Sequence, residues 1–175
     1  DTRAPQTVAW GNDAGDMDND GDLDILAAFG FVETTHGAGN GLRQPDAVFE
    51  QLANGTFRDR APTLRLDDDA PHRGIGVVDI NRDGWLDVYR VGLDGLARVD
   101  LANCSDETWV RIDPRQPAPN VHAIGATVRV ISDGQVWLRR MRAGGTSLGT
   151  GLPPEVHVGL GTRNAVDVEV TWPDG

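Results

Sequence analysis

The sequence predicts an all-β protein, because two observations favour short strands and a third argues against helices. Short Val, Ile, Leu and Trp runs alternate with turn residues, and Gly and Pro are plentiful, at 22 and 10 of 175 residues. No apolar pattern with a helical period reaches a useful length. With 39% hydrophobic residues, the chain can bury a core as one domain or as two small ones.

The strands are predicted in two groups with different patterns. Five short segments in the N-terminal part are bounded by turn residues, and they are residues 7–10, 25–29, 47–52, 75–78 and 86–91. From residue 108 the segments alternate: "TWVRI", "ATVRVI", "QVWLRRM", "EVHVGL" and "AVDVEVTW". Asp133-Gly134, between two of them, is a hairpin turn signal. We therefore predict two domains, residues 1–107 and 108–175.

Alternation also predicts which side chains of the C-terminal strands are buried. In the last strand, the face bearing Val166, Val168, Val170 and Trp172 is predicted to be buried, because polar residues occupy the other face. In "EVHVGL" the same pattern places His157 on the solvent side.

The charge of the chain excludes several classes of partner. The formal net charge is −11 at pH 7, and a surface this acidic repels nucleic acid and anionic lipid but attracts divalent cations. No apolar run is long enough to insert into a membrane. The single cysteine, Cys104, excludes an intrachain disulfide and a zinc site built from several cysteines.

Two acidic loops share the form D-x-[DN]-x-D-G-x-L-D. The first loop is "DMDNDGDLD", residues 16–24, and the second loop is "DINRDGWLD", residues 79–87. A solvated acidic tail needs no fixed spacing, whereas alternate side chains can converge on one cation if Gly21 or Gly84 lets the backbone curl. The predicted side-chain ligands are Asp16, Asp18, Asp20 and Asp24 in the first loop and Asp79, Asn81, Asp83 and Asp87 in the second.

Calcium fits this ligand pattern better than other cations. Ca²⁺ takes about 6–8 oxygens at about 2.3–2.6 Å, and the backbone carbonyl of Asp22 or Trp85 would add one, whereas Mg²⁺ demands octahedral geometry and keeps several waters. An EF-hand is excluded, because its twelfth position, here Ala27 or Arg90, needs Glu and its flanks must be helical. We expect two Ca²⁺ sites, with the first loop tighter because it offers four carboxylates against three.

The motifs resemble two known families. The loops, with "ANGTFRDR" between them, resemble the FG-GAP/VCBS repeats of integrin α-subunit propellers. Further on, "AIGATVRV", "EVHVGLG" and "VTWPDG" resemble the ASPIC/UnbV domain that follows such repeats. The resemblance implies β-propeller-type repeat blades followed by a small β-sandwich-like domain, with Ca²⁺ held by the loop residues named above. It also implies an extracellular, secreted protein, or one at the bacterial cell surface or in the periplasm.

We expect an incomplete propeller, because a closed one needs about 4–8 blades and two loops supply about two. Sheet edges left uncovered would then be paired in a homodimer. The expected function is calcium-stabilised binding, adhesion or scaffolding toward a protein or carbohydrate ligand. In the related repeats the strand runs straight into the first Asp. Here "GNDAG" separates Trp10 from Asp16, so we expect Asn12 or Asp13 to be displaced or to add a ligand.

The alternative function is a calcium-dependent hydrolase acting on esters or phosphoesters. Asp68 and His72 in "LDDDAPHRG" would supply a base beside a Ca²⁺ acting as Lewis acid, although the simpler interpretation of this stretch is a solvated loop. The sequence contains no Ser-His-Asp spacing, phosphate loop or HExxH motif. A coordination position open to a cleft would favour catalysis, whereas closed loops favour the binding module.

Overall fold

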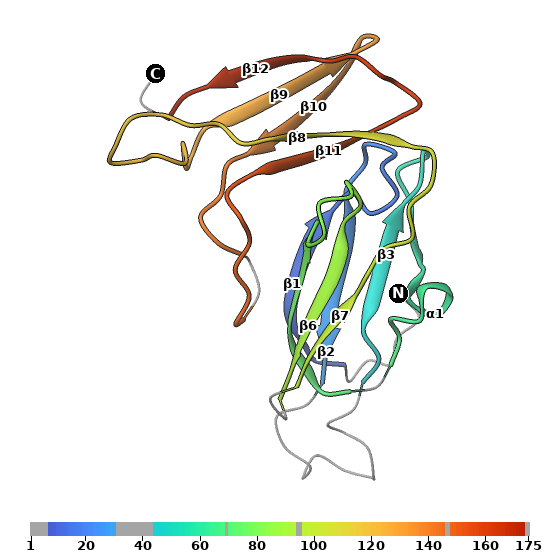
Figure 1. Ribbon diagram of the computed structural model, residues 1–175. Helices are drawn as coiled ribbons and strands as arrows, with labels where there is room; N and C mark the ends of the chain where they lie inside the picture. Colours follow the sequence, from blue (N-terminus) through green and yellow to red (C-terminus); the bar gives the residue numbers. More distant parts are fainter. Residues whose placement is uncertain (1–6, 31–43, 69, 94–95, 146–147, 174–175) are drawn as a thin grey trace.

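A computed structural model describes residues 7–30, 44–68, 70–93, 96–145 and 148–173. It consists of short antiparallel strands and one short helix (Figure 1), which confirms the predicted all-β class. The elements are β1 (Ala9–Gly15), β2 (Asp24–Phe29), β3 (Ala47–Gln51), β4 (Phe57–Asp59), α1 (Ala61–Leu64), β5 (His72–Val78), β6 (Asp87–Gly92), β7 (Ala97–Asp100), β8 (Thr108–Ile112), β9 (Thr127–Ser132), β10 (Gln135–Arg140), β11 (Val156–Gly161) and β12 (Asp167–Thr171).

The first seven strands form two sheets that pack against each other. One sheet has the order β1-β2-β3-β4 and the other β5-β6-β7. Strand β1 lies beside β5, and apolar side chains from both sheets, including Leu26, Val48, Ile75 and Val88, form a common core. Within the described residues neither sheet closes on itself, as expected for separate blades.

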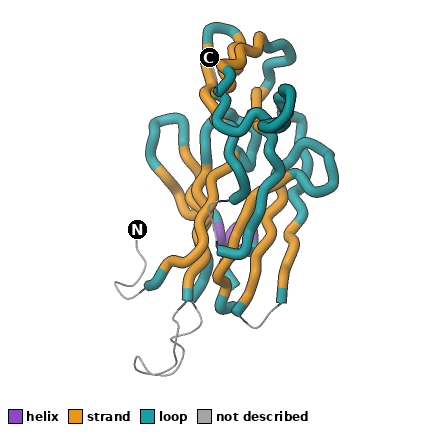
Figure 2. Tube along the Cα trace, turned by 90° about the vertical axis from the view of Figure 1, so that its left-hand side faces the viewer, coloured by secondary structure: helices purple, strands orange, loops and turns teal. Residues whose placement is uncertain are grey.

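The last five strands form two further sheets around a second core. The sheets have the orders β10-β9-β12 and β11-β8, and Val130, Trp137 and Val158 are among the side chains buried between them. Asp133 and Gly134, with φ of 49° and 79°, form the predicted hairpin turn between β9 and β10. Figures 1 and 2 show these C-terminal strands (β8 to β12) at one end of the N-terminal sheets, where both acidic loops lie.

Two predictions about the strands need correction, and the first concerns the bounds of β1. Strand β1 starts and ends later than the predicted segment 7–10 and reaches Gly15, directly before the first Asp of the loop. A bulge between Ala9 and Asn12 accommodates the polar stretch. Asp13 is buried there, and its Oδ2 accepts a hydrogen bond from Val77 N of β5 at 3.1 Å, so it connects the two sheets.

The second correction concerns the face of β12. Val166 and Val170 pack against the core as predicted, but Val168 and Trp172 are 42% and 38% exposed. Strand β12 lies at an edge of its sheet, so alternation alone overstates how much of this face the second sheet covers.

Exposed apolar side chains gather around β7, which is an edge strand of its sheet. They are Leu93, Leu96, Val99 and Leu101, each more than half exposed. An uncovered strand edge of this kind can pair with another chain. Among the described residues, no helix is both long and apolar enough to cross a membrane.

Candidate metal centre

The first loop brings three carboxylates together at the ends of two paired strands. Strand β1 ends at Gly15 and β2 begins at Asp24, so the loop is held at both sides by one sheet. One carboxylate oxygen from each of Asp16, Asp18 and Asp20 lies within 4.8 Å of the others. Oxygens on opposite sides of a single Ca²⁺ are about 4.6–5.2 Å apart. These three side chains therefore fit around one cation.

Asp16 has a buried carboxylate oxygen that no hydrogen bond from the described residues satisfies. Its side chain is only 1% exposed. Oxygen Oδ2 accepts hydrogen bonds from Gly21 N at 3.0 Å and from Gly159 N at 2.8 Å. Among the described residues, Oδ1 is buried without any hydrogen-bond partner. Leaving a buried carboxylate oxygen unsatisfied is costly, and a cation between the three carboxylates would satisfy it.

The pKa values of the first loop point the same way. The pKa of Asp16 is raised to about 7, mainly by burial and also by the negative charges of Asp20 and Asp18, which together outweigh the Gly159 hydrogen bond and the positive charge of Arg139. Burial also raises the pKa of Asp18, with Asp20 adding to the effect, and it raises that of Asp24 to about 6. Without a cation the ionised loop is therefore unfavourable, and a bound divalent cation would restore the charged form.

The second loop repeats the backbone of the first. Gly21 and Gly84 have φ of 101° and 91°, so both glycines supply the predicted turn. Asn19 and Arg82, at the fourth position, also share positive φ, at 58° and 66°. The closing carboxylates act alike as well, since Met17 N donates to Asp24 Oδ2 at 3.0 Å and Ile80 N donates to Asp87 Oδ2 at 2.9 Å.

The side chains of the second loop are less open to a metal. Both oxygens of Asp79 accept backbone hydrogen bonds, from Asp83 N and Gly84 N, each at 3.0 Å. Asn81 Nδ2 donates to Asp83 Oδ2 at 2.7 Å. Among the described acidic, His and Cys residues, only the first loop groups three ligand atoms closely enough for one metal. The carbonyl ligands at Asp22 and Trp85 stay predictions.

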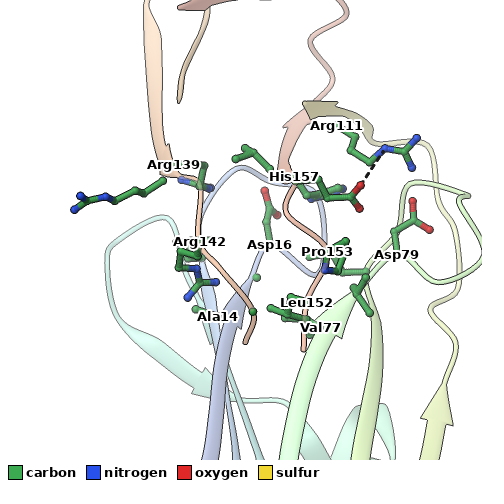
Figure 3. A pocket seen from close by; sticks show the side chains of 18 of the residues that line it. Ala14, Asp16, Val77, Asp79, Arg111, Arg139, Arg142, Leu152, Pro153 and His157 are labelled. Carbon is green, nitrogen blue, oxygen red and sulfur yellow. Dashed lines mark ion pairs between the residues drawn. The ribbon is translucent and has the colours of Figure 1, made fainter. Parts of the chain in front are cut away.

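A cavity of about 260 Å³ lies where the two loops face the C-terminal strands (Figure 3). Asp16 and Asp79, the first residues of the two loops, both line it. So does His157, together with arginines from β8, β10 and the chain after β10. The C-terminal strands therefore cover one side of the acidic loops, whereas Asp18 and Asp20 stay exposed.

The prediction that His157 faces solvent is wrong. Its ring stacks on Trp109, with ring centroids 6.1 Å apart, and its Nε2 lies 3.0 Å from the carbonyl oxygen of Gly84. Burial lowers the pKa of His157, so the neutral ring donates its Nε2–H to that carbonyl. Alternation correctly places His157 on the face of β11 that points away from the core. That face contacts the second loop instead of solvent.

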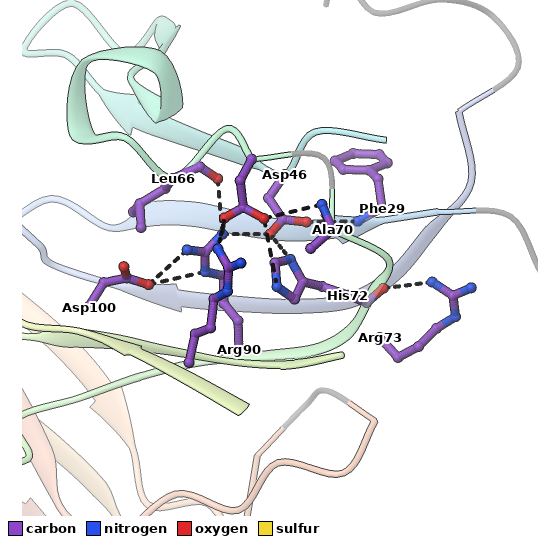
Figure 4. A network of polar contacts seen from close by, with 10 residues as sticks. Phe29, Asp46, Leu66, Ala70, His72, Arg73, Arg90 and Asp100 are labelled. Atoms are coloured by element: carbon purple, nitrogen blue, oxygen red, sulfur yellow. Dashed lines mark hydrogen bonds and ion pairs between the residues drawn. The ribbon is translucent and has the colours of Figure 1, made fainter. Parts of the chain in front are cut away.

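Asp68 and His72 belong to a buried ion network at the opposite end of the strands (Figure 4). His72 is 2% exposed, and its Nδ1 lies 2.6 Å from Asp46 Oδ2. Arg90 NH1 donates to Asp46 at 3.2 Å and to Asp68 at 2.6 Å, and NH2 donates to Asp100 at 2.8 Å. Burial alone would raise the pKa of Asp68, but the Arg90 guanidinium outweighs it and holds that pKa below its usual value.

Neither of these two residues lines the cavity between the loops and the C-terminal strands or the second cavity beside α1. Their partners lie just before β3 and in β6 and β7, which sequence patterns could not bring together. Sequence patterns also gave no sign that Trp109, Trp137 and Gly159 are neighbours of the acidic loops, because these residues are distant in the sequence and meet the loops only in the folded chain.

Two consecutive parts of the chain match known protein families. Residues 16–89 match the FG-GAP-like repeat family, whose repeats are propeller-type, and residues 116–175 match the ASPIC and UnbV family. The chain is 27% identical to cartilage acidic protein 1 of Mus musculus over 166 residues, which are 93% of this chain and 25% of that protein. It is 27% identical to cartilage acidic protein 1 of Homo sapiens over 164 residues, which are 91% of this chain and 24% of that protein.

The chain thus spans about a quarter of the length of the curated relatives it matches. The two family matches follow one another in the order that the motifs predicted, and the first covers both acidic loops. Residues 16–89 therefore resemble FG-GAP-like repeats, and residues 116–175 resemble an ASPIC and UnbV region.

Proposed function

We propose that the chain is an extracellular β module that binds Ca²⁺ through its two acidic loops and acts in binding, adhesion or scaffolding. The observation that carries this proposal is Asp16 Oδ1, which is buried without a partner beside two further carboxylates. Oxygen-only ligands from a flexible loop suit Ca²⁺. The match to FG-GAP-like repeats and the name of the curated relatives, cartilage acidic protein 1, support an extracellular setting.

In this proposal the metal has a structural task. Three of the strands that carry the loops, β2, β5 and β6, supply most of the side chains of the N-terminal core, and β1 lies beside β5. A cation in each loop would fix the ends of these strands and remove the repulsion among the carboxylates. The chain would then present a calcium-stabilised surface to a protein or carbohydrate ligand. We propose no hydrolase activity, because Asp68 and His72 are tied into the buried network of Arg90.

Calorimetric titration of the metal-free chain with Ca²⁺ tests the proposal. We expect two sites, with dissociation constants near the range of extracellular modules, about 10⁻⁴–10⁻³ M, and the tighter site in the first loop. Asp18→Asn should weaken the tighter site toward the affinity of the second loop, which carries Asn81 at the same position. Asp133→Asn is the matched control, because it removes one carboxylate that is 80% exposed in a hairpin turn far from both loops in sequence. Absence of heat from the unmodified chain would refute calcium binding.

A further inference from the structure

Each acidic loop is covered by a tryptophan of the C-terminal strands at its glycine. A Cβ atom added to Gly21 would lie 2.3 Å from Trp137 Nε1, and one added to Gly84 would lie 1.6 Å from Trp109 Cε2. Such distances leave no room for any side chain. The two glycines therefore serve a second purpose besides the turn, because they let an indole ring lie directly on the loop backbone.

The first loop is also hydrogen-bonded to the C-terminal strands at three points. Gly159 N donates to Asp16 Oδ2 at 2.8 Å, and Gly161 N donates to the carbonyl of Asn19 at 2.8 Å. Arg139 donates from NH2 to the carbonyl of Gly21 at 3.0 Å. These bonds join β10 and β11 to the segment that carries the three grouped carboxylates.

The second loop is held less closely. His157 bonds to the carbonyl of Gly84, and Arg82 pairs with Glu155 at 3.0 Å through a side chain that is 54% exposed. Asp16 accepts one hydrogen bond from its own loop and one from Gly159, whereas the two bonds to the carboxylate of Asp79 both come from its own loop. The link from the C-terminal strands to a predicted metal ligand is thus specific to the first loop.

We infer that the C-terminal strands complete the calcium site of the first loop, with the Gly159 amide as the positioning group for Asp16. This inference rests on the proposed function. The Gly159 N–H holds Oδ2 of Asp16, and Oδ1 is left without a hydrogen-bond partner among the described residues, in a carboxylate that groups with those of Asp18 and Asp20. The same contact removes Asp16 from water, which makes the carboxylate costly without a cation and a better ligand with one.

Calcium binding and docking of the C-terminal strands therefore stabilise each other. In the docked state the carboxylates are desolvated and positioned, so this state binds Ca²⁺ more tightly than an undocked state in which water solvates Asp16. A ligand shifts an equilibrium by its differential affinity for the two states. By reciprocity, Ca²⁺ must strengthen docking by the same factor.

Gly159→Ala in the full chain tests the coupling. The new Cβ would lie 2.2 Å from Asn19 Cα, so it separates β11 from the first loop without altering any predicted ligand. We expect the tighter Ca²⁺ affinity, measured by calorimetry, to fall by roughly ten-fold, within the usual range for coupled sites. Gly151→Ala is the matched control, because its Cβ would meet nothing within 4 Å; its affinity should equal that of the unmodified chain.

Hydrogen exchange of the unmodified chain provides a second measurement that needs no variant. Added Ca²⁺ should slow exchange of the amides of Gly159 and Gly161, which donate to the first loop, with little change in β12. Equal affinities of Gly159→Ala and Gly151→Ala, or unchanged exchange at these two amides in a chain that binds Ca²⁺, would overturn the inference. A chain that binds no Ca²⁺ at all would instead refute the proposed function and the inference with it.

Discussion

Replacing Arg90 with methionine should strongly destabilise the chain, because this residue neutralises a buried cluster of carboxylates. Arg90 is 1% exposed and reaches three acidic side chains, those of Asp46, Asp68 and Asp100. Asp46 is 0% exposed. Methionine keeps much of the volume of the side chain but takes the positive charge of Arg90 away from the buried carboxylate of Asp46, which also bonds to His72 and to the amide of Phe29.

Removing one partner of a buried ion pair typically costs about 3–5 kcal/mol, because the other charge stays buried without compensation. For a chain of this length, each kcal/mol lowers the Tm by about 2–4 °C. The expected loss is therefore about 10 °C. Arg98→Met is the matched control, because Arg98 is 51% exposed and contacts Asp68 alone; an exposed pair contributes at most about 1 kcal/mol.

Thermal unfolding followed by circular dichroism, with Ca²⁺ present throughout, measures both variants. Adding Asp46→Asn to Arg90→Met should restore part of the lost stability, because it removes the uncompensated charge. If Arg90→Met unfolds within about 1 kcal/mol of the unmodified chain, the network does not stabilise the fold as reasoned here. The case against a catalytic use of Asp68 and His72 would then weaken too.

Four further predictions follow from the loops, the network and the exposed sheet edge. Chelation of Ca²⁺ should lower the Tm, since a ligand at 100 times its dissociation constant adds about 2.7 kcal/mol per site; Asp20→Ala should reduce this response more than Asp83→Ala. The pKa of Asp16, raised by burial from 3.8 to about 7, lies above its unfolded value, so the metal-free chain should lose stability as pH rises from about 4 to about 7. Over the same range Ca²⁺ should bind more tightly and release protons, which calorimetry in buffers of different ionisation enthalpy would detect. Purified chain should show no calcium-dependent hydrolysis of activated esters or phosphoesters; activity abolished by His72→Ala with folding intact would contradict this. Light scattering at micromolar concentration should report a dimer through the β7 edge, and a monomer would show that the edge stays uncovered.

The features that the sequence predicted correctly are those set by short-range patterns. The turn at Asp133-Gly134 and the curl at Gly21 and Gly84 depend on a few neighbouring residues, and their φ values agree with the prediction. Strands with clear alternation, such as β8 and β9, were also found within a residue of their ends. By contrast, β4 and β7 contain few apolar residues and are mostly exposed, so they carry no pattern to detect.

The features that the sequence could not predict depend on pairing between distant elements. Nothing near Arg90 indicates that it contacts Asp46, just before β3 in the other sheet, and Asp100 in the neighbouring strand β7, because the packing and register of the two sheets decide these contacts. The contact between Trp137 and the first loop also depends on pairing between distant elements, since Trp137 follows Gly21 by more than a hundred residues in the sequence.

His157 shows how a correct pattern can lead to a wrong environment. Alternation in β11 separates Val156 and Val158, which are buried in the C-terminal core, from His157. A two-layer arrangement would leave that second face in water. Here the acidic loops provide a third layer, so the face that looks solvent-exposed in the sequence contacts Gly84 and stacks on Trp109. The polar side of an alternating strand is therefore where contact between the two parts of this chain should be sought, and His157→Ala should loosen the second loop while leaving the C-terminal core folded.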